Sequence, residues 1–454
     1  MNIVAMNQES PAPGVVFAQL FRGLVVRWPH LPMSPASRAP AAEPLPALQQ
    51  EIARLAALPQ VRSAMEWFRD QEAQFTRWQL EVARIAAPPF GEQARSDWLA
   101  EQFAALGLGC IEQDSLGNVF GSQAAVGASC VSISAHLDTV FPAGTSMDAR
   151  QQGRKLHGPS VSDNSAGVTA VLALAAAVVR FGLLQGNSTP TSLLFIGNVG
   201  EEGEGDLRGM RNIFTDSQWK DKITASVVID GAGTDTIVAE ALGSRRFEVT
   251  LRGPGGHSWS DFGAPNPIVA LARAIHLFSQ TRVSSSPKTT FNIGVIHGGT
   301  SVNSIPQSAS MRVDIRSTSA FEIERLELEL RSAVEHATEE EEIRSANDTS
   351  LRSAELEAEI LAIGNRPAGE LPPNACILQI ARAVDAYLGN TAKVQRASTD
   401  ANIPISLGRE AIAIGAGGAG GGAHTLHEWF DPAGRELGLR RILLIVLALA
   451  GTVK

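Results

Sequence analysis

The fold class follows most directly from one segment, Val131-Ser132-Ile133-Ser134-Ala135-His136-Leu137-Asp138-Thr139. Its first five residues alternate between apolar and small polar side chains, which predicts a strand. A histidine and an aspartate follow immediately, and both side chains can bind a metal ion. The segment therefore predicts a buried strand with candidate ligands at its carboxyl end.

Strands and helices are also predicted in the rest of the chain around this segment. Further strands are predicted over residues 192–199, 225–229, 392–395 and 411–415, and helices over 168–181 and from Arg435 onwards. Between residues 49 and 106 the apolar residues recur mostly at threes and fours, which indicates helices. Strands that alternate with helices predict an α/β fold, with a mostly parallel sheet covered by helices on both faces.

The middle of the chain follows a different order. Strands are predicted over 246–252, 289–296, 310–316 and 356–363, and helices over 267–278 and 321–337. This β-α-β-β-α-β order is typical of a ferredoxin-like unit, which folds independently. We therefore expect an inserted domain at residues 244–363, inside an α/β domain formed by residues 51–243 and 364–454. Residues 1–50 are expected to be a poorly ordered extension, and the acidic run 339–342 a solvated helix end.

Composition excludes several classes of protein. The 454 residues carry a net charge of −9 with 19% charged residues, so no basic surface for nucleic acid is expected. The longest apolar runs, 170–179 and 442–450, are much shorter than the ~20 residues that cross a bilayer. Three cysteines form neither a disulfide framework nor a metal-binding CxxC pair. With no signal peptide evident, we expect a cytoplasmic protein that binds neither nucleic acid nor membrane.

Residues that can bind metal ions follow several of the predicted strands. They are His136, Asp163, Glu201, Glu202, Asp230, His424 and His427. Singly, each has an ordinary structural explanation, such as a helix N-cap for an aspartate that precedes a helix. Together, two histidines, two aspartates and a glutamate are the nitrogen and oxygen ligands that two divalent ions would use, with one carboxylate bridging them. Because open α/β sheets bind ligands outside the carboxyl ends of their strands, these side chains can meet in one crevice.

At this point the sequence resembles the di-zinc peptidases that include glutamate carboxypeptidase, tripeptidase T, acetylornithine deacetylase and succinyl-diaminopimelate desuccinylase. The resemblance extends from about residue 90 to the C-terminus. It rests on the motifs HLDT, SDNSAG, NVGEEGEGDLRG, VIDG, GPGGHS, GNRPAG and AHTLHEW and on the segment from Asn303 to Arg316. The family implies a catalytic α/β domain interrupted by a smaller ferredoxin-like lid, which often forms a homodimer.

The resemblance also implies a set of ligands and catalytic groups. The ligands would be His136, Asp163, Asp230, Glu202 and His424, with Asp163 bridging two ions. Zinc is the default metal, and cobalt or manganese could use the same ligands. Asp138 would orient the ring of His136. Glu201, which binds no metal, would be the general base.

Two details of the motifs bear on this assignment. The family pattern places a glutamate four residues after the ligand histidine, which selects His424 with Glu428 over His427. Many family members have two adjacent aspartates where this chain has Asp163 followed by Asn164. The bridging position is kept, but Asn164 cannot supply the second negative charge.

The lid carries candidate substrate-binding residues of its own. His257, in the GPGGHS turn, would reach the active site of the partner subunit and stabilise the oxyanion of the tetrahedral intermediate. Asn303 and Arg316 match lid positions near the same oxyanion and substrate pocket. Arg366 matches the arginine that binds a substrate's free carboxylate. Arg245 matches no functional position and is expected to be structural.

The leading hypothesis is a metal-dependent hydrolase of an amide bond in a small peptide or an N-acyl amino acid. The motifs do not separate a peptidase from an N-acyl-amino-acid deacylase. A non-catalytic binding protein on the same fold would be expected to lack the base or a ligand, and none is missing. A related aminopeptidase lineage shares the order of the ligands, but the inserted domain with its GGHS turn argues against it.

Overall fold

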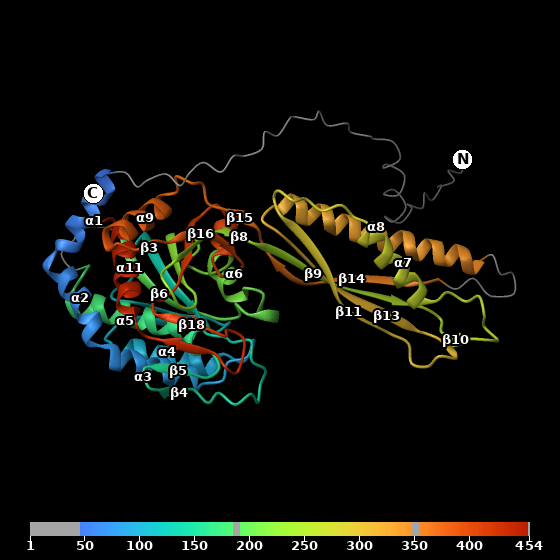
Figure 1. Cartoon of the computed structure of the whole chain (residues 1–454), viewed down its shortest axis with the longest axis horizontal. Helices are drawn as coiled ribbons and strands as arrows, with labels where there is room; N and C mark the ends of the chain where they lie inside the picture. Colours follow the sequence, from blue (N-terminus) through green and yellow to red (C-terminus); the bar gives the residue numbers. More distant parts are fainter. Residues whose placement is uncertain (1–45, 185–190, 347–354, 453–454) are drawn as a thin grey trace, which may run out of the picture. The chain divides into compact units, whose positions relative to one another are not determined.

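The computed structural model describes residues 46–184, 191–346 and 355–452. A nine-stranded sheet forms the centre of the α/β part, with the order β1-β2-β6-β3-β7-β17-β8-β15 and with β16 beside β8 (Figure 1). Its strands are β1 (Cys110–Gln113), β2 (Val119–Ser122), β3 (Ser129–His136), β6 (Thr191–Asn198), β7 (Ile223–Ile229), β8 (Thr236–Ala241), β15 (Gly369–Glu370), β16 (Lys393–Ala397) and β17 (Glu410–Ile414). The central strands β6, β3, β7 and β17 run parallel, and β16 runs parallel to β8. The predicted α/β fold with a mostly parallel sheet is confirmed.

Helices cover both faces of this sheet. They are α4 (Gln93–Ala105), α5 (Ser165–Phe181), α6 (Arg208–Thr215), α9 (Cys376–Leu388), α10 (Asn402–Ser406) and α11 (Arg435–Leu447), with short helical turns at Gly203–Gly205 and Ala448–Thr452. Successive residues of a strand point to opposite faces. In β7, for example, Val227 joins the hydrophobic cluster that contains α5 and α11, and Val228 joins the cluster that contains α6 and α10. Both faces are therefore buried, as a parallel sheet requires.

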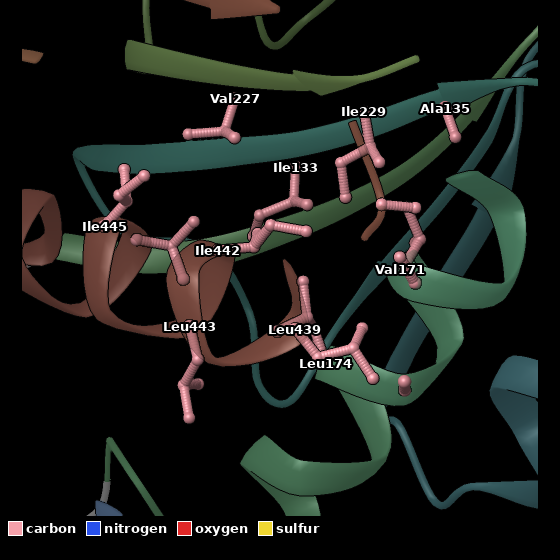
Figure 2. Packing of buried hydrophobic residues seen from close by; sticks show 14 of the residues in the cluster. Ile133, Ala135, Val171, Leu174, Val227, Ile229, Leu439, Ile442, Leu443 and Ile445 are labelled. Atoms are coloured by element: carbon pink, nitrogen blue, oxygen red, sulfur yellow. The ribbon is translucent and has the colours of Figure 1, made fainter. Parts of the chain in front are cut away.

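The packing between the sheet and the pair α5 and α11 is shown in Figure 2. Ile133 of β3 and Val227 of β7 belong to the same hydrophobic cluster as Val171 of α5 and Ile442 of α11, and all four side chains are buried. Burial of each such side chain contributes roughly 1.5–3 kcal/mol. This packing fixes the strand ends that carry the candidate ligands. In the described ranges, no helix combines the length and the apolar character that crossing a membrane requires.

The first described segment is helical, as the spacing of its apolar residues predicted. It contains α1 (Pro46–Ala57), α2 (Pro59–Asp70) and α3 (Glu72–Ala83). Because α1 begins at Pro46, residues 46–50 belong to this helix and not to the extension expected for residues 1–50. The rest of that expected extension, residues 1–45, lies outside the described residues.

A second, small sheet was not predicted. It has the strand order β18-β19-β5-β4 and consists of β4 (Arg150–Gln152), β5 (Lys155–His157), β18 (Ala419–Gly421) and β19 (Trp429–Asp431). The pairing of β19 with β5 brings the segment around His424 next to the segment that leads to Asp163. This sheet therefore joins two of the predicted ligand motifs.

The inserted domain, called the lid from here on, extends from β9 to β14. Its strands are β9 (Gly243–Arg252), β10 (Gly256–His257), β11 (Thr289–Gly298), β12 (Ser304–Ile305), β13 (Ser308–Ser317) and β14 (Glu357–Arg366), and its helices are α7 (Pro267–Ser279) and α8 (Ala320–Ala346). Four strands form an antiparallel sheet in the order β11-β13-β9-β14. Helices α7 and α8 pack on this sheet through one hydrophobic cluster (Figure 1). The predicted β-α-β-β-α-β order is present, with the short pair β10 and β12 added.

The acidic run 339–342 is only partly the solvated helix end that the sequence suggested, because Glu339 and Glu340 are exposed but Glu341 is not. Helix α8 continues through it to Ala346, and the Glu341 side chain is fully buried. The Glu341 carboxylate accepts a hydrogen bond from the Asn266 amide and forms ion pairs with Arg273 and Arg344. These partners come from outside the run, which is why its composition alone was misleading.

Candidate metal centre

The five predicted ligands meet at one edge of the nine-stranded sheet. His136 is the last residue of β3, Glu202 and Asp230 follow β6 and β7, Asp163 lies just before α5, and His424 lies between β18 and β19. Because β3, β6 and β7 are parallel, their carboxyl ends lie at the same edge. Parallel pairing therefore brings together residues that are far apart in the sequence.

Asp163 lies at the centre of this group. Its Oδ1 is 3.1 Å from His136 Nε2, and its Oδ2 is 3.1 Å from His424 Nε2. Glu202 Oε1 lies 2.9 Å from the same His424 nitrogen. Asp230 Oδ1 lies 4.0 Å from His136 Nε2. Each oxygen of Asp163 thus faces a different histidine, which is the arrangement of a bridging carboxylate.

These separations fit the chemistry of divalent metal ions. Two atoms that bind one zinc ion at about 2.0–2.1 Å lie roughly 3.3 Å apart in tetrahedral geometry. His136, Asp163 and Glu202 each offer a ligand atom, and these atoms all lie within 4.8 Å of one another. Imidazole nitrogens and carboxylate oxygens suit zinc, and also cobalt or manganese. The donor set therefore fits two divalent ions that share Asp163.

Glu428 holds the loop that presents Asp163. Its carboxylate accepts hydrogen bonds from the backbone amides of Ser160, Ser162 and Asp163, at 3.2, 2.6 and 2.7 Å. The motif that selected His424 therefore also supplies the residue that positions Asp163, the candidate bridging carboxylate. His427, the competing candidate, is exposed, and within the described ranges it shares no ion pair with the ligands.

Asn164 has a structural function that explains an amide at this position. Its Oδ1 accepts hydrogen bonds from Gly167 N at the start of α5 and from Gly231 N, at 3.1 and 3.2 Å. Its Nδ2 donates to Ile229 O at 2.8 Å. An aspartate could not make this donation when ionised. Asn164 therefore links the start of α5 to the end of β7, next to the candidate ligand Asp230.

Asp138 connects two parts of the centre. Its carboxylate accepts hydrogen bonds from the backbone amides of Glu201 and Glu202 at 2.9 and 2.7 Å, and Oδ1 lies 3.6 Å from His136 Nδ1. Burial opposes ionisation, but the hydrogen bond and charge of His136 and the two amides lower the pKa of Asp138 below its ordinary value. His136 Nδ1 lies 3.1 Å from the backbone carbonyl of Asp138, so this residue is suited to orient the His136 ring through its carbonyl and its nearby carboxylate.

The centre is crowded with acidic groups. Burial raises the pKa of Glu202 to about 8, and the charge of Glu201 adds to the effect. Burial likewise raises the pKa of Asp230 to about 7, with a further contribution from the charge of Asp163. A hydrogen bond to Asp163 raises the pKa of His424 to about 9. Such a cluster gains from compensating positive charge, which divalent cations would supply.

The candidate base Glu201 and the candidate substrate-binding Arg366 contact each other. Glu201 follows β6 and is 5% exposed, and Arg366 ends β14 and is 7% exposed. Arg366 Nη1 donates to Glu201 Oε1 at 2.9 Å, and Nη2 donates to the Glu201 backbone carbonyl. Burial raises the pKa of Glu201, and the Arg366 charge partly offsets this rise. In this structure, the Arg366 guanidinium therefore faces Glu201, the candidate base.

One buried residue near Glu201, Asp400, was missed by sequence reasoning. Asp400 is 1% exposed and accepts a hydrogen bond from Asn198 Nδ2 at 2.6 Å. Burial, reinforced by the charge of Glu201, raises the pKa of Asp400 well above its ordinary value. A signal for Asp400 was present, since it comes three residues after the end of β16 at Ala397, as the ligands come after other strands.

The three remaining predicted site residues lie in the lid. His257 is exposed at the end of β10, and its Nδ1 accepts a hydrogen bond from Trp259 N at 3.2 Å. Asn303 lies next to this turn, because its carbonyl accepts a hydrogen bond from Ser258 N at 3.0 Å. Arg316, on β13, is paired with Asp314 at 2.6 Å. Among the described residues, no hydrogen bond or ion pair joins these three to the five ligands.

Two family models match the chain. The model of the peptidase dimerisation domain matches residues 240–342, which lie in or next to the lid. The model of peptidase family M28 matches residues 118–246, which include His136, Asp163, Glu202 and Asp230. The two matches meet where the nine-stranded sheet gives way to the lid.

One relative in sequence and two solved structures are also similar to this chain. Succinyl-diaminopimelate desuccinylase from Rhodospirillum centenum is 26% identical over 52% of this chain, and this chain spans 58% of that relative's length. The structure of the aminopeptidase PepT from Bacillus cereus covers 83% of this chain and 98% of its own, with 19% identity and a TM-score of 0.64. A dinuclear metal-binding peptidase of the M20 family from Bacillus subtilis covers 85% and 99%, with 14% identity and a TM-score of 0.59. These two solved structures share the fold of this chain.

Proposed function

Since the chain belongs to the M20 family of peptidases, we propose that it hydrolyses an amide bond in a small peptide or an N-acyl amino acid, in a metal-dependent reaction. The observation that carries the proposal is the position of Asp163, whose two oxygens face His136 and His424. A further carboxylate, that of Glu201, pairs with Arg366 and forms no ion pair with either histidine in the described residues. A bridged pair of sites with a separate base is what hydrolysis by two metal ions requires.

The proposed ligands divide into two sets. His136 and Asp230 would hold one ion, Glu202 and His424 would hold the other, and Asp163 would belong to both. Zinc is the expected metal, and cobalt or manganese suits the same donors. When bound, the metal pair supplies Lewis-acid activation of the amide carbonyl and of the attacking water.

Glu201 is the proposed general base. It would take a proton from the attacking water and give that proton to the leaving nitrogen. Its burial raises its pKa, which suits a group that must both accept and release a proton near neutral pH. Asp138 would hold the Glu201 backbone amide while it orients His136.

The lid would complete the site in a homodimer. The match to the peptidase dimerisation domain supports dimer formation. We propose that His257, exposed on its turn, acts in the active site of the partner subunit, where it stabilises the oxyanion. Asn303, which lies next to that turn, and Arg316 would contribute to substrate binding.

The proposal is tested by removing and restoring the metal. The purified protein is stripped with a chelator, reloaded with zinc, cobalt or manganese, and assayed on a panel of dipeptides, tripeptides and N-acyl amino acids. We expect activity to disappear on stripping and to return on reloading. Full activity in chelator, in protein without a bound divalent ion, would contradict the proposal.

A second candidate is deacylation, which the desuccinylase relative favours. The same panel separates the two activities, because a deacylase cleaves succinylated or acetylated amino acids and leaves unmodified dipeptides intact. A protein that binds the metals but cleaves nothing in the panel would support a non-catalytic binding function.

A further inference from the structure

The arginine that ends the last lid strand makes an unusual contact with the proposed base. Arg366 donates two hydrogen bonds to Glu201, one to the carboxylate oxygen Oε1 at 2.9 Å and one to the backbone carbonyl. One planar guanidinium therefore restrains both the side chain and the backbone of the same residue. A lysine ammonium, which is a single point donor, cannot reproduce this pair of contacts.

The surroundings keep Arg366 in this orientation. Nη1 also donates to Ser398 Oγ at 3.3 Å. Glu201 is the carboxylate with which Arg366 forms an ion pair among the described residues. At 7% exposure, the Arg366 side chain has little surface left for a substrate.

The backbone next to Arg366 is fixed to the same loop that carries Glu201. Asp206 accepts a hydrogen bond from Asn365 N at 2.9 Å, and Arg211 donates to Asn365 O at 2.7 Å. On its other side, Arg366 is paired in the lid sheet with Ser244 of β9. The lid strand and the catalytic loop are thus joined at the base itself.

We propose that Arg366 is a positioning residue that holds the Glu201 carboxylate in place for proton transfer, and that it does not bind the carboxylate of the substrate. This inference rests on the function proposed above for Glu201. It replaces the role that the family resemblance suggested for Arg366. The two roles make different kinetic predictions, because a positioning residue affects kcat, whereas a residue that only binds substrate affects KM.

The test compares Arg366→Lys and Arg366→Ala with the wild type, all loaded with zinc, on the best substrate of the panel. We expect kcat to fall roughly 10–100-fold in Arg366→Lys, because a small displacement of the base is costly. KM should stay within about twofold, because Arg366 makes no substrate contact that would change ground-state binding. Added methylguanidinium should restore part of the kcat of Arg366→Ala, and metal content should not change.

Arg245→Lys is the matched control. Arg245 lies at the same junction and donates hydrogen bonds to Asn365 and Glu327. Among the described residues, it forms no hydrogen bond or ion pair with Glu201. Its kinetics should match the wild type.

Two results would overturn the inference. One is a KM that rises more than about tenfold in Arg366→Lys with kcat unchanged, which would assign Arg366 to the substrate. The other is a loss of metal or of folded protein in Arg366→Lys with no rescue of Arg366→Ala, which would make the residue merely structural. If the wild type cleaves nothing in the panel, the proposed function fails first and the inference with it.

Discussion

At the scale of single residues, the neighbours Glu201 and Glu202 have different partners. Glu202 lies 2.9 Å from His424, a proposed ligand, whereas Glu201 is bonded to Arg366. We expect Glu201→Gln to keep its metal and to lose roughly 10²–10⁴-fold in kcat, the usual contribution of general acid–base catalysis. Glu202→Gln should lower metal occupancy itself. Metal analysis alongside steady-state kinetics checks both, and equal metal loss in the two variants would contradict these assignments.

Also at this scale, the proposed ligands would give up protons when metal binds. In the metal-free protein Glu202 and Asp230 have pKa values raised to about 8 and about 7, so both carry protons over part of the neutral range. A bound cation favours their ionised forms, so binding releases protons and the apparent affinity rises with pH between about 6 and 8. Calorimetric titration with zinc in buffers of different ionisation enthalpy measures this release. Binding heats that do not depend on the buffer would refute it.

At the scale of secondary structure elements, the packing of the C-terminal part of helix α8 includes one buried acid, Glu341. Glu341→Ala would leave the Asn266 amide without its acceptor and Arg273 and Arg344 without their buried carboxylate. We expect a loss of about 1–3 kcal/mol in the free energy of unfolding, the typical penalty for unsatisfied buried polar groups. Glu339→Ala, at an exposed position of the same helix, is the control and should be neutral. Denaturant unfolding of both variants tests the prediction.

Some strands could be predicted from the sequence and others could not, for reasons that depend on their length and pattern. Strands β3, β6 and β7 were predictable because their apolar runs are bounded by turn residues, and their parallel pairing then placed His136 and Asp230 together. The sheet of β18, β19, β5 and β4 was not predictable, because strands of three residues have too little periodicity. The burial of Glu341 and the pairing of Arg366 with Glu201 depend on residues distant in sequence, which no local pattern encodes.

At the scale of the whole molecule, two copies of the chain would share their active sites. The His257→Ala and Glu201→Gln variants should each be nearly inactive, since an oxyanion donor is worth roughly 10²–10³ in kcat. Mixing the two variants should restore part of the activity. In a hybrid dimer, one site then combines an intact Glu201 with the intact His257 of the other subunit. Sedimentation analysis should show a dimer, and a monomer at every concentration or no recovery after subunit exchange would argue against this assembly.

The way in which the chain enters and leaves the lid has a consequence for the architecture. Ser244 and Arg366 are paired neighbours in the lid sheet, and Ala241 and Gly369 are paired neighbours in the nine-stranded sheet. The 120-odd residues between them therefore begin and end at adjacent points of two successive antiparallel ladders, one in each sheet. Joining the two strands there by a tight turn would break no pairing in the large sheet, and closing so short a loop costs little entropy. The insertion is in this respect a cassette, so domains of very different size could be exchanged at this junction without changing the topology of their host.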